Sequence, residues 1–169
     1  MTTMLKNLLF LMAVVLIFNN KALSQSQLDG LWVKLSHRTL TGADFPNTTA
    51  DTIGITSNGK QLIIAKSYLF VPGQPDSVIV TKVIADGKPT QEQRADGRFR
   101  KLTVTSSDAK HLAEQYDISE PGVENTKSYS FHEEWTLGDN GILTIIRTYK
   151  GEESAEQDFV AQATYERRK

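Results

Sequence analysis

The sequence predicts an all-β fold, an eight- to nine-stranded antiparallel up-and-down β-barrel. Apolar residues alternate with polar ones through most of the chain after residue 25, which is the periodicity of half-buried strands. Turn signals rich in Gly, Asn, Asp and Pro separate these runs at short intervals. No stretch after residue 25 has a convincing helical pattern. Closure into a barrel removes exposed strand edges, and a two-sheet sandwich is the alternative.

Residues 1–24 have the layout of a secretory signal peptide. Lys6 supplies the basic start, Leu8 to Phe18 is an unbroken apolar run, and the small residues Ala22 and Ser24 predict cleavage before Gln25. The apolar run is about half of the ~20 residues that a membrane span requires. We therefore expect one exported domain, residues 25–169, that is secreted or periplasmic and has no membrane span.

Composition excludes several classes of function. The chain has no Cys, a formal net charge of -1 and a pI near 6.3. Without Cys there is no thiol catalysis, no Cys-ligated metal and no lipid attachment to a mature N-terminal Cys. The balanced charge gives no electrostatic case for binding nucleic acid or an anionic membrane surface. We expect no cofactor.

The element around which the fold prediction is organised is a long hairpin over residues 128–149. The loop Asp139-Asn140-Gly141 is typical of a three-residue connection, with Gly141 in the left-handed conformation. This loop sets a register in which the apolar faces of the two strands coincide and two inward charges meet. The expected facing pairs are Leu137 with Leu143, Trp135 with Ile145, Glu133 with Arg147, and Phe131 with Tyr149.

The cleanest hairpin signal is centred on Asn58-Gly59, a type I′ turn. Two central turn residues predict Ile55 opposite Leu62 and Ile53 opposite Ile64. Further strands are expected over residues 28–35, 77–85, 98–106 and 157–167, with loops over residues 39–50, 71–76 and 86–89. Residues 90–97 have no core face and are predicted to be a mobile loop or an exposed strand extension.

Residues 107–119 allow two interpretations. As a strand over residues 111–119, Leu112, Tyr116 and Ile118 share one face. As a helix, Asp108 is the N-cap and Leu112, Ala113 and Tyr116 form a stripe. The neighbouring strands and the shortness of such a helix favour the strand.

Motifs near the two ends of the mature chain resemble those of the lipocalins and related calycin barrels. Gly30-Leu31-Trp32 is similar to their Gly-x-Trp entry, and residues 164–168 are similar to their basic closing strand. Residues 83–89 and 135–145 resemble small secreted bacterial lipocalin-like proteins. The resemblance implies that Gly30, Trp32 and Arg167 or Arg168 close the barrel base, with the arginine stacked on an inward Trp32. Alternation alone instead places Leu31, Val33 and Leu35 inward.

Seven residues are candidate ligand contacts, because they put aromatic rings and a charged pair on inward faces. They are Trp135, Tyr129, Phe131, Glu133, Arg147, Tyr149 and Tyr116. The alternative is ordinary core around a self-satisfied ion pair. We expect a non-catalytic binding protein for a small, partly apolar ligand. The alternative function is an envelope structural or protein-interaction module with a filled core and an apolar patch around Ile63, Leu69 and Phe70.

Metal and catalytic motifs are weak. His37, His111 and His132 lack partners at metal-ligand spacing. Ser106 and Ser107 lie near Asp108 and His111, but such clusters usually form turns, and no nucleophile-elbow motif is present. We expect no metal site, no catalytic residues and no enzyme activity.

Overall fold

The computed structural model describes residues 26–45, 47–58, 61–69, 77–122, 126–152 and 157–169. The expected signal peptide, the turn residues Gly59 and Lys60, and the loop over residues 71–76 lie outside the described residues. The strands are β1 (Gly30–Gly42), β2 (Thr52–Asn58), β3 (Gln61–Tyr68), β4 (Ser77–Ile84), β5 (Thr90–Gln93), β6 (Phe99–Asp108), β7 (His111–Ser119), β8 (Lys127–Leu137), β9 (Leu143–Gly151) and β10 (Phe159–Arg167).

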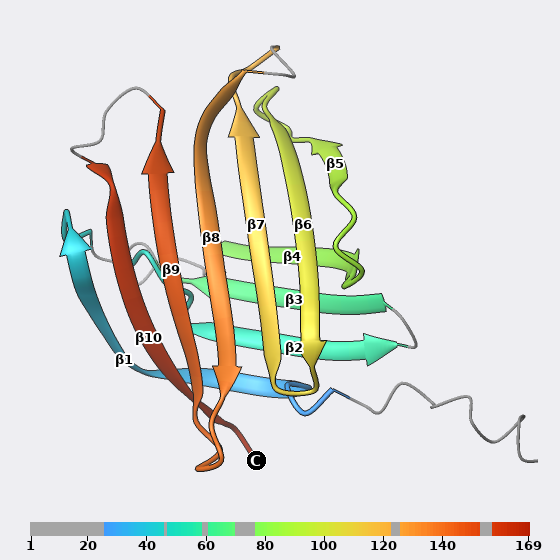
Figure 1. The fold of residues 1–169 in the computed structure, drawn as a ribbon, viewed down its shortest axis with the longest axis vertical. Helices are drawn as coiled ribbons and strands as arrows, with labels where there is room; N and C mark the ends of the chain where they lie inside the picture. The colour runs from blue at the N-terminus through green and yellow to red at the C-terminus, as the bar shows by residue number, and fades with distance from the viewer. Residues whose placement is uncertain (1–25, 46, 59–60, 70–76, 123–125, 153–156) are drawn as a thin grey trace, which may run out of the picture.

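The ten strands form one antiparallel sheet in the order β4-β3-β2-β1-β10-β9-β8-β7-β6-β5. In Figure 1, β6 to β9 run side by side at the front, and β2 to β4 cross behind them. The sheet curls into a nearly closed barrel, as the sequence predicts, but it has more strands than the eight or nine expected. The additional strand is the short, exposed β5, which pairs with β6. It lies within residues 90–97, for which the sequence allowed either a loop or an exposed strand extension.

Strand β1 carries the sheet from one layer to the other (Figure 1). Its first part pairs with β2, and the strand pairs with β10 from Trp32 to Gly42. Register shifts between Lys34 and Ser36 and between Thr39 and Thr41 mark irregularities that let a strand bend. The expected loop over residues 39–50 is therefore wrong at its start, because pairing with β10 keeps this polar segment extended.

Contacts between the β4–β5 connection and β6 draw the two sheet ends together. Asp86 forms an isolated antiparallel bridge with Thr105, and the Gly87 amide donates to the Val104 carbonyl at 2.9 Å. These contacts leave a nearly closed interior rather than an open two-layer sandwich.

The β8–β9 hairpin has the predicted register. Gly141 adopts φ 79°, and the Gly138 amide donates to the Ile142 carbonyl at 2.9 Å. The facing pairs are Leu137 with Leu143, Trp135 with Ile145, Glu133 with Arg147, and Phe131 with Tyr149. The turn chemistry and the apolar pattern select the same register, so the prediction is confirmed.

The predicted β2–β3 register is wrong by two residues. Ile55 faces Ile64, and Ile53 faces Lys66, instead of Leu62 and Ile64 respectively. A shift of two residues keeps every side chain on its face, because side chains alternate with period two. Apolar alternation therefore cannot separate the two registers. The observed one carries Lys66 to its ion-pair partners on β7 and β8.

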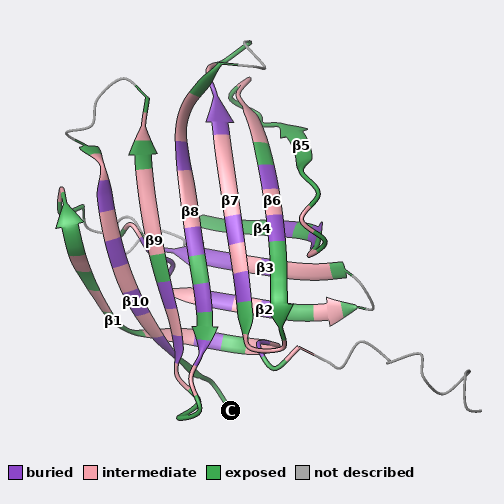
Figure 2. Ribbon diagram, viewed as in Figure 1, coloured by how far each residue is buried: buried purple, intermediate pink, exposed green. Residues whose placement is uncertain are grey.

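Residues 111–119 form strand β7, as favoured over the helix. Strands β6 to β10 place alternate residues inward, and Figure 2 shows buried segments repeating along them. The most buried large side chains are Trp32, Trp135, Tyr165, Ile53, Ile64, Leu143, Glu114 and Val104. Two of these, Ile53 and Ile64, come from the crossing layer, so both layers share one core.

The barrel base is organised around Trp32, which is fully buried, while Leu31 and Leu35 are exposed. The inward aliphatic face expected from alternation is therefore wrong, and the inward Trp32 implied by the resemblance is observed. The Arg167 guanidinium lies 4.7 Å from the centroid of the Trp32 ring. Gly30 has φ 137°, and a Cβ there would meet the Arg167 side chain at 3.4 Å. Only a residue without a side chain fits this conformation and approach comfortably.

Replacing Trp135 by alanine tests the inward face of β8. Trp135 is 1% exposed, so Trp135→Ala should lower the free energy of unfolding by about 3–5 kcal/mol. Glu134→Ala, at an exposed neighbouring position of the same strand, is the control and should change it by less than about 0.5 kcal/mol. Urea denaturation measures both. Equal midpoints for Trp135→Ala and the parent protein would contradict the face assignment.

Candidate functional site

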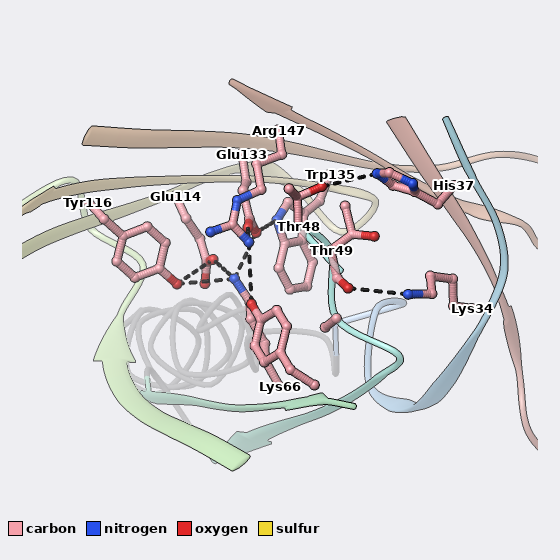
Figure 3. A network of polar contacts seen from close by, with 12 residues as sticks. Lys34, His37, Thr48, Thr49, Lys66, Glu114, Tyr116, Glu133, Trp135 and Arg147 are labelled. Carbon is pink, nitrogen blue, oxygen red and sulfur yellow. Dashed lines mark hydrogen bonds and ion pairs between the residues drawn. The ribbon is translucent and has the colours of Figure 1, made fainter. Parts of the chain in front are cut away.

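A cluster of buried ions spans the barrel interior (Figure 3). The Lys66 ammonium on β3 donates to Glu114 Oε2 on β7, and to Glu133 Oε2 on β8 at 2.7 Å. It also donates to the Tyr116 hydroxyl at 3.1 Å. The Lys66, Glu114 and Glu133 side chains are 7%, 0% and 5% exposed. We call Lys66, Glu114, Glu133 and Arg147 the ion cluster.

Glu133 has the most complete set of donors in the ion cluster. Besides Lys66, its Oε2 accepts from Trp135 Nε1 at 3.0 Å. Its Oε1 lies 3.3 Å from Arg147 Nη1, so the contact expected between the two inward charges of the hairpin is present. Glu114 differs, because its Oε2 accepts from Tyr116 at 2.7 Å while its buried Oε1 has no hydrogen-bond partner.

These surroundings shift the two carboxyl groups in opposite directions. Burial favours the neutral form of Glu133, but Lys66 and Arg147 outweigh it and lower the pKa of Glu133 to about 2. Burial, reinforced by the negative charge of Glu133, raises the pKa of Glu114 despite the opposing effect of Lys66. Burial would lower the pKa of Lys66, but Glu114 and Glu133 raise it well above its usual value. The cluster therefore holds Lys66 firmly as a cation.

A cavity of about 90 Å³ lies on the side of the ion cluster where β8 begins. We call it the mouth cavity. Its lining combines cations, one carboxylate, and aromatic and aliphatic side chains. The lining residues are Lys66, Tyr68, Ile79, Arg94, Arg100, Tyr116, Ile118, Tyr129, Phe131, Glu133 and Arg147.

Among the described residues, the interior on the other side of the ion cluster is closely packed. A space of about 10 Å³ remains there, bounded by side chains that include Ala50, Ile145 and Tyr165. That volume admits at most about one water molecule. The ion cluster thus separates a packed base from the mouth cavity.

The mouth cavity brings together most of the ligand contacts expected from sequence. Tyr116, Tyr129, Phe131, Glu133 and Arg147 all line it. Trp135 is not in the lining but lies behind Glu133 and donates to it. Tyr149 is also not in the lining. Its ring stacks on Phe159 at 5.4 Å and packs against Phe131 at 5.2 Å.

Sequence reasoning missed Lys66, Glu114 and Arg100. Lys66 and Glu114 lie at positions whose alternate neighbours are inward and apolar, as with Ile64 before Lys66 and Leu112 before Glu114. A charge on an otherwise apolar strand face was the signal that identified Glu133, and it marks these two positions equally. Arg100 has a buried apolar neighbour on that face on one side only, Leu102. What alternation cannot supply is the pairing of Lys66 with Glu114, 48 residues away.

Three arginines at the mouth stack on aromatic rings. The Arg147 guanidinium lies 3.9 Å from the Phe131 ring centroid, and Arg100 lies 5.7 Å from that of Tyr116. Arg98 lies 6.0 Å from the Tyr129 ring centroid. Such contacts stabilise the cations and restrict their orientation. Within the part of the chain that the structure describes, the Nε atoms of all three are nevertheless buried without a hydrogen-bond partner.

Two other places carry less functional signal. A shallow hollow of about 630 Å³ along the second half of β1 is lined by residues 37–42 and 44 of a single region of chain. Ser106 donates to the carbonyls of Asp108 and His111, so its hydroxyl is occupied by a turn. Within the described residues, no group of three or more His, Cys, Asp or Glu side chains is placed to hold a metal ion.

A scan against protein-family models and a search of curated proteins found no match to this chain. Among the described residues there is no helix long and apolar enough to cross a membrane. The function proposed below therefore follows from the geometry of the interior.

The two carboxyl groups of the ion cluster should respond differently to neutralisation. Glu133→Gln leaves Lys66 and Arg147 short of a buried counterion and should cost about 3 kcal/mol at pH 7. Glu114→Gln removes a carboxylate that contacts Lys66 but not Arg147 and whose pKa is raised rather than lowered, and it should cost less, about 1 kcal/mol. Urea denaturation of both variants measures the difference. A larger loss for Glu114→Gln would contradict the opposite pKa shifts of the two carboxyl groups.

The same variants carry a pH signature. The folded-state pKa of Glu133 lies below its ordinary value, so its stabilisation is present above pH 4.5 and is lost as pH falls towards about 2. Glu114 has the opposite effect on the free energy of unfolding, because its folded-state pKa is raised. Its contribution stabilises the fold at low pH and is lost as pH rises. In Glu133→Gln the free energy of unfolding should therefore fall less steeply between pH 4.5 and about 2 than it does in the parent protein.

Proposed function

We propose that this protein is a non-catalytic, lipocalin-like binding protein that takes a small, partly apolar ligand in the mouth cavity. The observation that supports this most is the asymmetry of the interior. The base is packed, whereas the mouth retains a cavity that combines buried charges with aromatic and aliphatic walls. A largely apolar hollow with a few convergent polar groups is the usual form of a small-molecule site.

The size of the cavity limits the ligand. About 90 Å³ is the space of roughly three water molecules in the liquid, and sites for drug-sized ligands enclose several times more. The ligand is therefore compact, or has one compact end inside while the rest projects from the mouth. Ile79, which is 43% exposed, forms part of the rim along which such a ligand would extend.

The charge states of the ion cluster favour binding over catalysis. The lowered pKa of Glu133 makes it a weak proton acceptor near neutral pH. The raised pKa of Lys66 keeps its amine protonated and therefore not nucleophilic. Both groups are also fully engaged with each other, so they serve better as fixed charges than as reacting groups.

Export and lipocalin-like ancestry belong to the same proposal. The signal-like layout of residues 1–24 supports a secreted or periplasmic location. The contact of Arg167 with Trp32, next to Gly30, supports the closure role that the resemblance implies for these residues.

A second candidate function is favoured by the outer face of the crossing layer. Leu31, Gly54, Ala65 and Val80 form one row across β1, β2, β3 and β4. In the described sheet β4 has a neighbour on one side, and Val78, Val80 and Ile84 are exposed on it. Apolar edge strands of this kind pair with an identical strand. The occupant would be a second copy of this chain, joined through β4.

Native mass spectrometry of protein purified from the organism that encodes it tests both candidates. The proposed function predicts a monomer carrying a co-purified small molecule. Ile79→Trp fills the rim of the mouth cavity and should abolish that added mass. Val78→Trp is the matched control, because Val78 lies next to Ile79 on β4 but is 58% exposed and faces away from the interior. The Val78→Trp protein should retain the added mass.

A protein without added mass, or equal retention in Ile79→Trp and Val78→Trp, would contradict binding in the mouth cavity. A dimer mass that disappears in Val80→Lys would favour the second candidate instead.

A further inference from the structure

The mouth cavity concentrates positive charge in a protein that has little net charge. The chain as a whole carries a formal charge of -1, but the cavity is lined by Lys66, Arg94, Arg100 and Arg147 against the single carboxylate of Glu133. Glu114, in contact with Lys66 from behind, supplies a second carboxylate. With Arg94 at the rim set aside, the lining cations Lys66, Arg100 and Arg147 outnumber the carboxylates of Glu133 and Glu114 by one.

The remaining acidic partners of these arginines lie in solvent. Arg100 contacts Glu92 at 2.8 Å, but the Glu92 side chain is 57% exposed, whereas that of Arg100 is 11% exposed. Arg94 lies 3.7 Å from Asp96, and both are about half exposed. Pairs with exposed carboxylates are screened by water and are weak. They therefore do little to neutralise the charge inside the cavity.

Arg100 and Arg147 also have unused hydrogen-bond donors. The Nε atoms of both are buried and have no partner, although both side chains line the mouth cavity. Arg147 directs Nη1 to Glu133 and, at 3.4 Å, to the Tyr68 hydroxyl, which leaves its Nε edge unused. Buried polar groups are normally satisfied. The Nε edge of a guanidinium matches the two oxygens of a carboxylate.

The rest of the lining is suited to an apolar body. Ile118, Phe131, Tyr129 and Ile79 form the non-polar walls, and Ile79 reaches the solvent-exposed rim. Inorganic anions gain nothing from such walls, whereas an aromatic or short aliphatic group is stabilised by burial there.

We infer that the ligand of the mouth cavity is a small organic monocarboxylate with an aromatic or short aliphatic body. Its carboxylate accepts from the Nε edge of Arg147 and from Nε of Arg100, whose Nη2 contacts Glu92, and its body lies against Phe131 and Ile118 towards the Ile79 rim. One negative charge matches the one that is unpaired among the buried groups. This inference rests on the proposed function, since it specifies the ligand of the same site.

Isothermal titration calorimetry with three probes tests this inference on the purified protein. Benzoate supplies both the charge and the ring, benzyl alcohol supplies the ring without the charge, and inorganic phosphate supplies charge without the ring. Benzoate should bind at least about tenfold more tightly than either of the others. Arg100→Gln should weaken benzoate at least about tenfold, because a charge-assisted pair is lost.

Lys101→Gln is the matched control, since it removes the same charge from an exposed neighbour on the same strand and should change affinity by less than about twofold. Arg147→Lys keeps the charge but loses the planar fork, and should also weaken benzoate. A measurement that requires no variant is the NMR shift of the arginine Nε–H resonances. Benzoate should move those of Arg100 and Arg147 downfield.

The outcomes separate the two proposals. Equal binding of benzoate and benzyl alcohol, with no effect of Arg100→Gln, overturns the anion inference and leaves the binding function intact. Phosphate binding as tight as that of benzoate overturns the inference that the ligand has an apolar organic body. No binding of any probe at about 10 mM, with unmoved Nε–H resonances, overturns both the inference and the proposed site.

Discussion

The structure depends on a buried lysine that has to meet two carboxylates across the barrel. Lys66 comes from the crossing layer, whereas Glu114 and Glu133 come from the opposite wall. A single charge left unpaired in such a place costs several kcal/mol, although a paired one adds little over an apolar core. The ion cluster therefore matters more for selecting the strand register than for the free energy of unfolding of the folded protein. It accounts for the β2–β3 register, which apolar alternation leaves undecided.

The same cluster divides the interior into two parts with different roles. Towards the base, Trp32, Tyr165 and Leu143 are almost fully buried, and little space remains. Towards the mouth, inward positions of β6 and β9 are occupied by Arg100 and Arg147. These side chains stack on aromatic rings and leave space beside them. A packed base holds the strands in place, and the mouth is free to carry a site. The proposed ligand chemistry follows from that separation.

The sequence predicted local features of this fold well and long-range contacts poorly. The β8–β9 hairpin is correct in register because its turn residues and its apolar pattern agree. The β2–β3 hairpin is not, because its turn signal favours a register two residues away from the observed one, and its alternation fits both registers equally. Trp32 shows the limit of alternation alone, which places it outside. Its inward position follows from the resemblance of Gly30-Leu31-Trp32 to a known barrel entry.

The candidate site shows the same division. Glu133 and Arg147 could be paired from sequence because one hairpin places them opposite each other. Lys66 and Glu114 lie on inward faces that could be recognised strand by strand, but their partnership depends on how the sheet curls. Arg100 was missed although the expected strand over residues 98–106 places it on the same inward face as Leu102, because no apolar residue precedes it on that face.

The most direct test of the buried ion cluster is an NMR spectrum of lysine ammonium groups in the folded protein. Burial and two carboxylates should slow proton exchange at Lys66 Nζ, giving a protected NH₃⁺ signal that persists above pH 10.5, the ordinary lysine value, and is missing from Lys66→Met. A spectrum in which no protected ammonium signal depends on Lys66, or one in which that signal titrates below pH 10.5, would contradict the account.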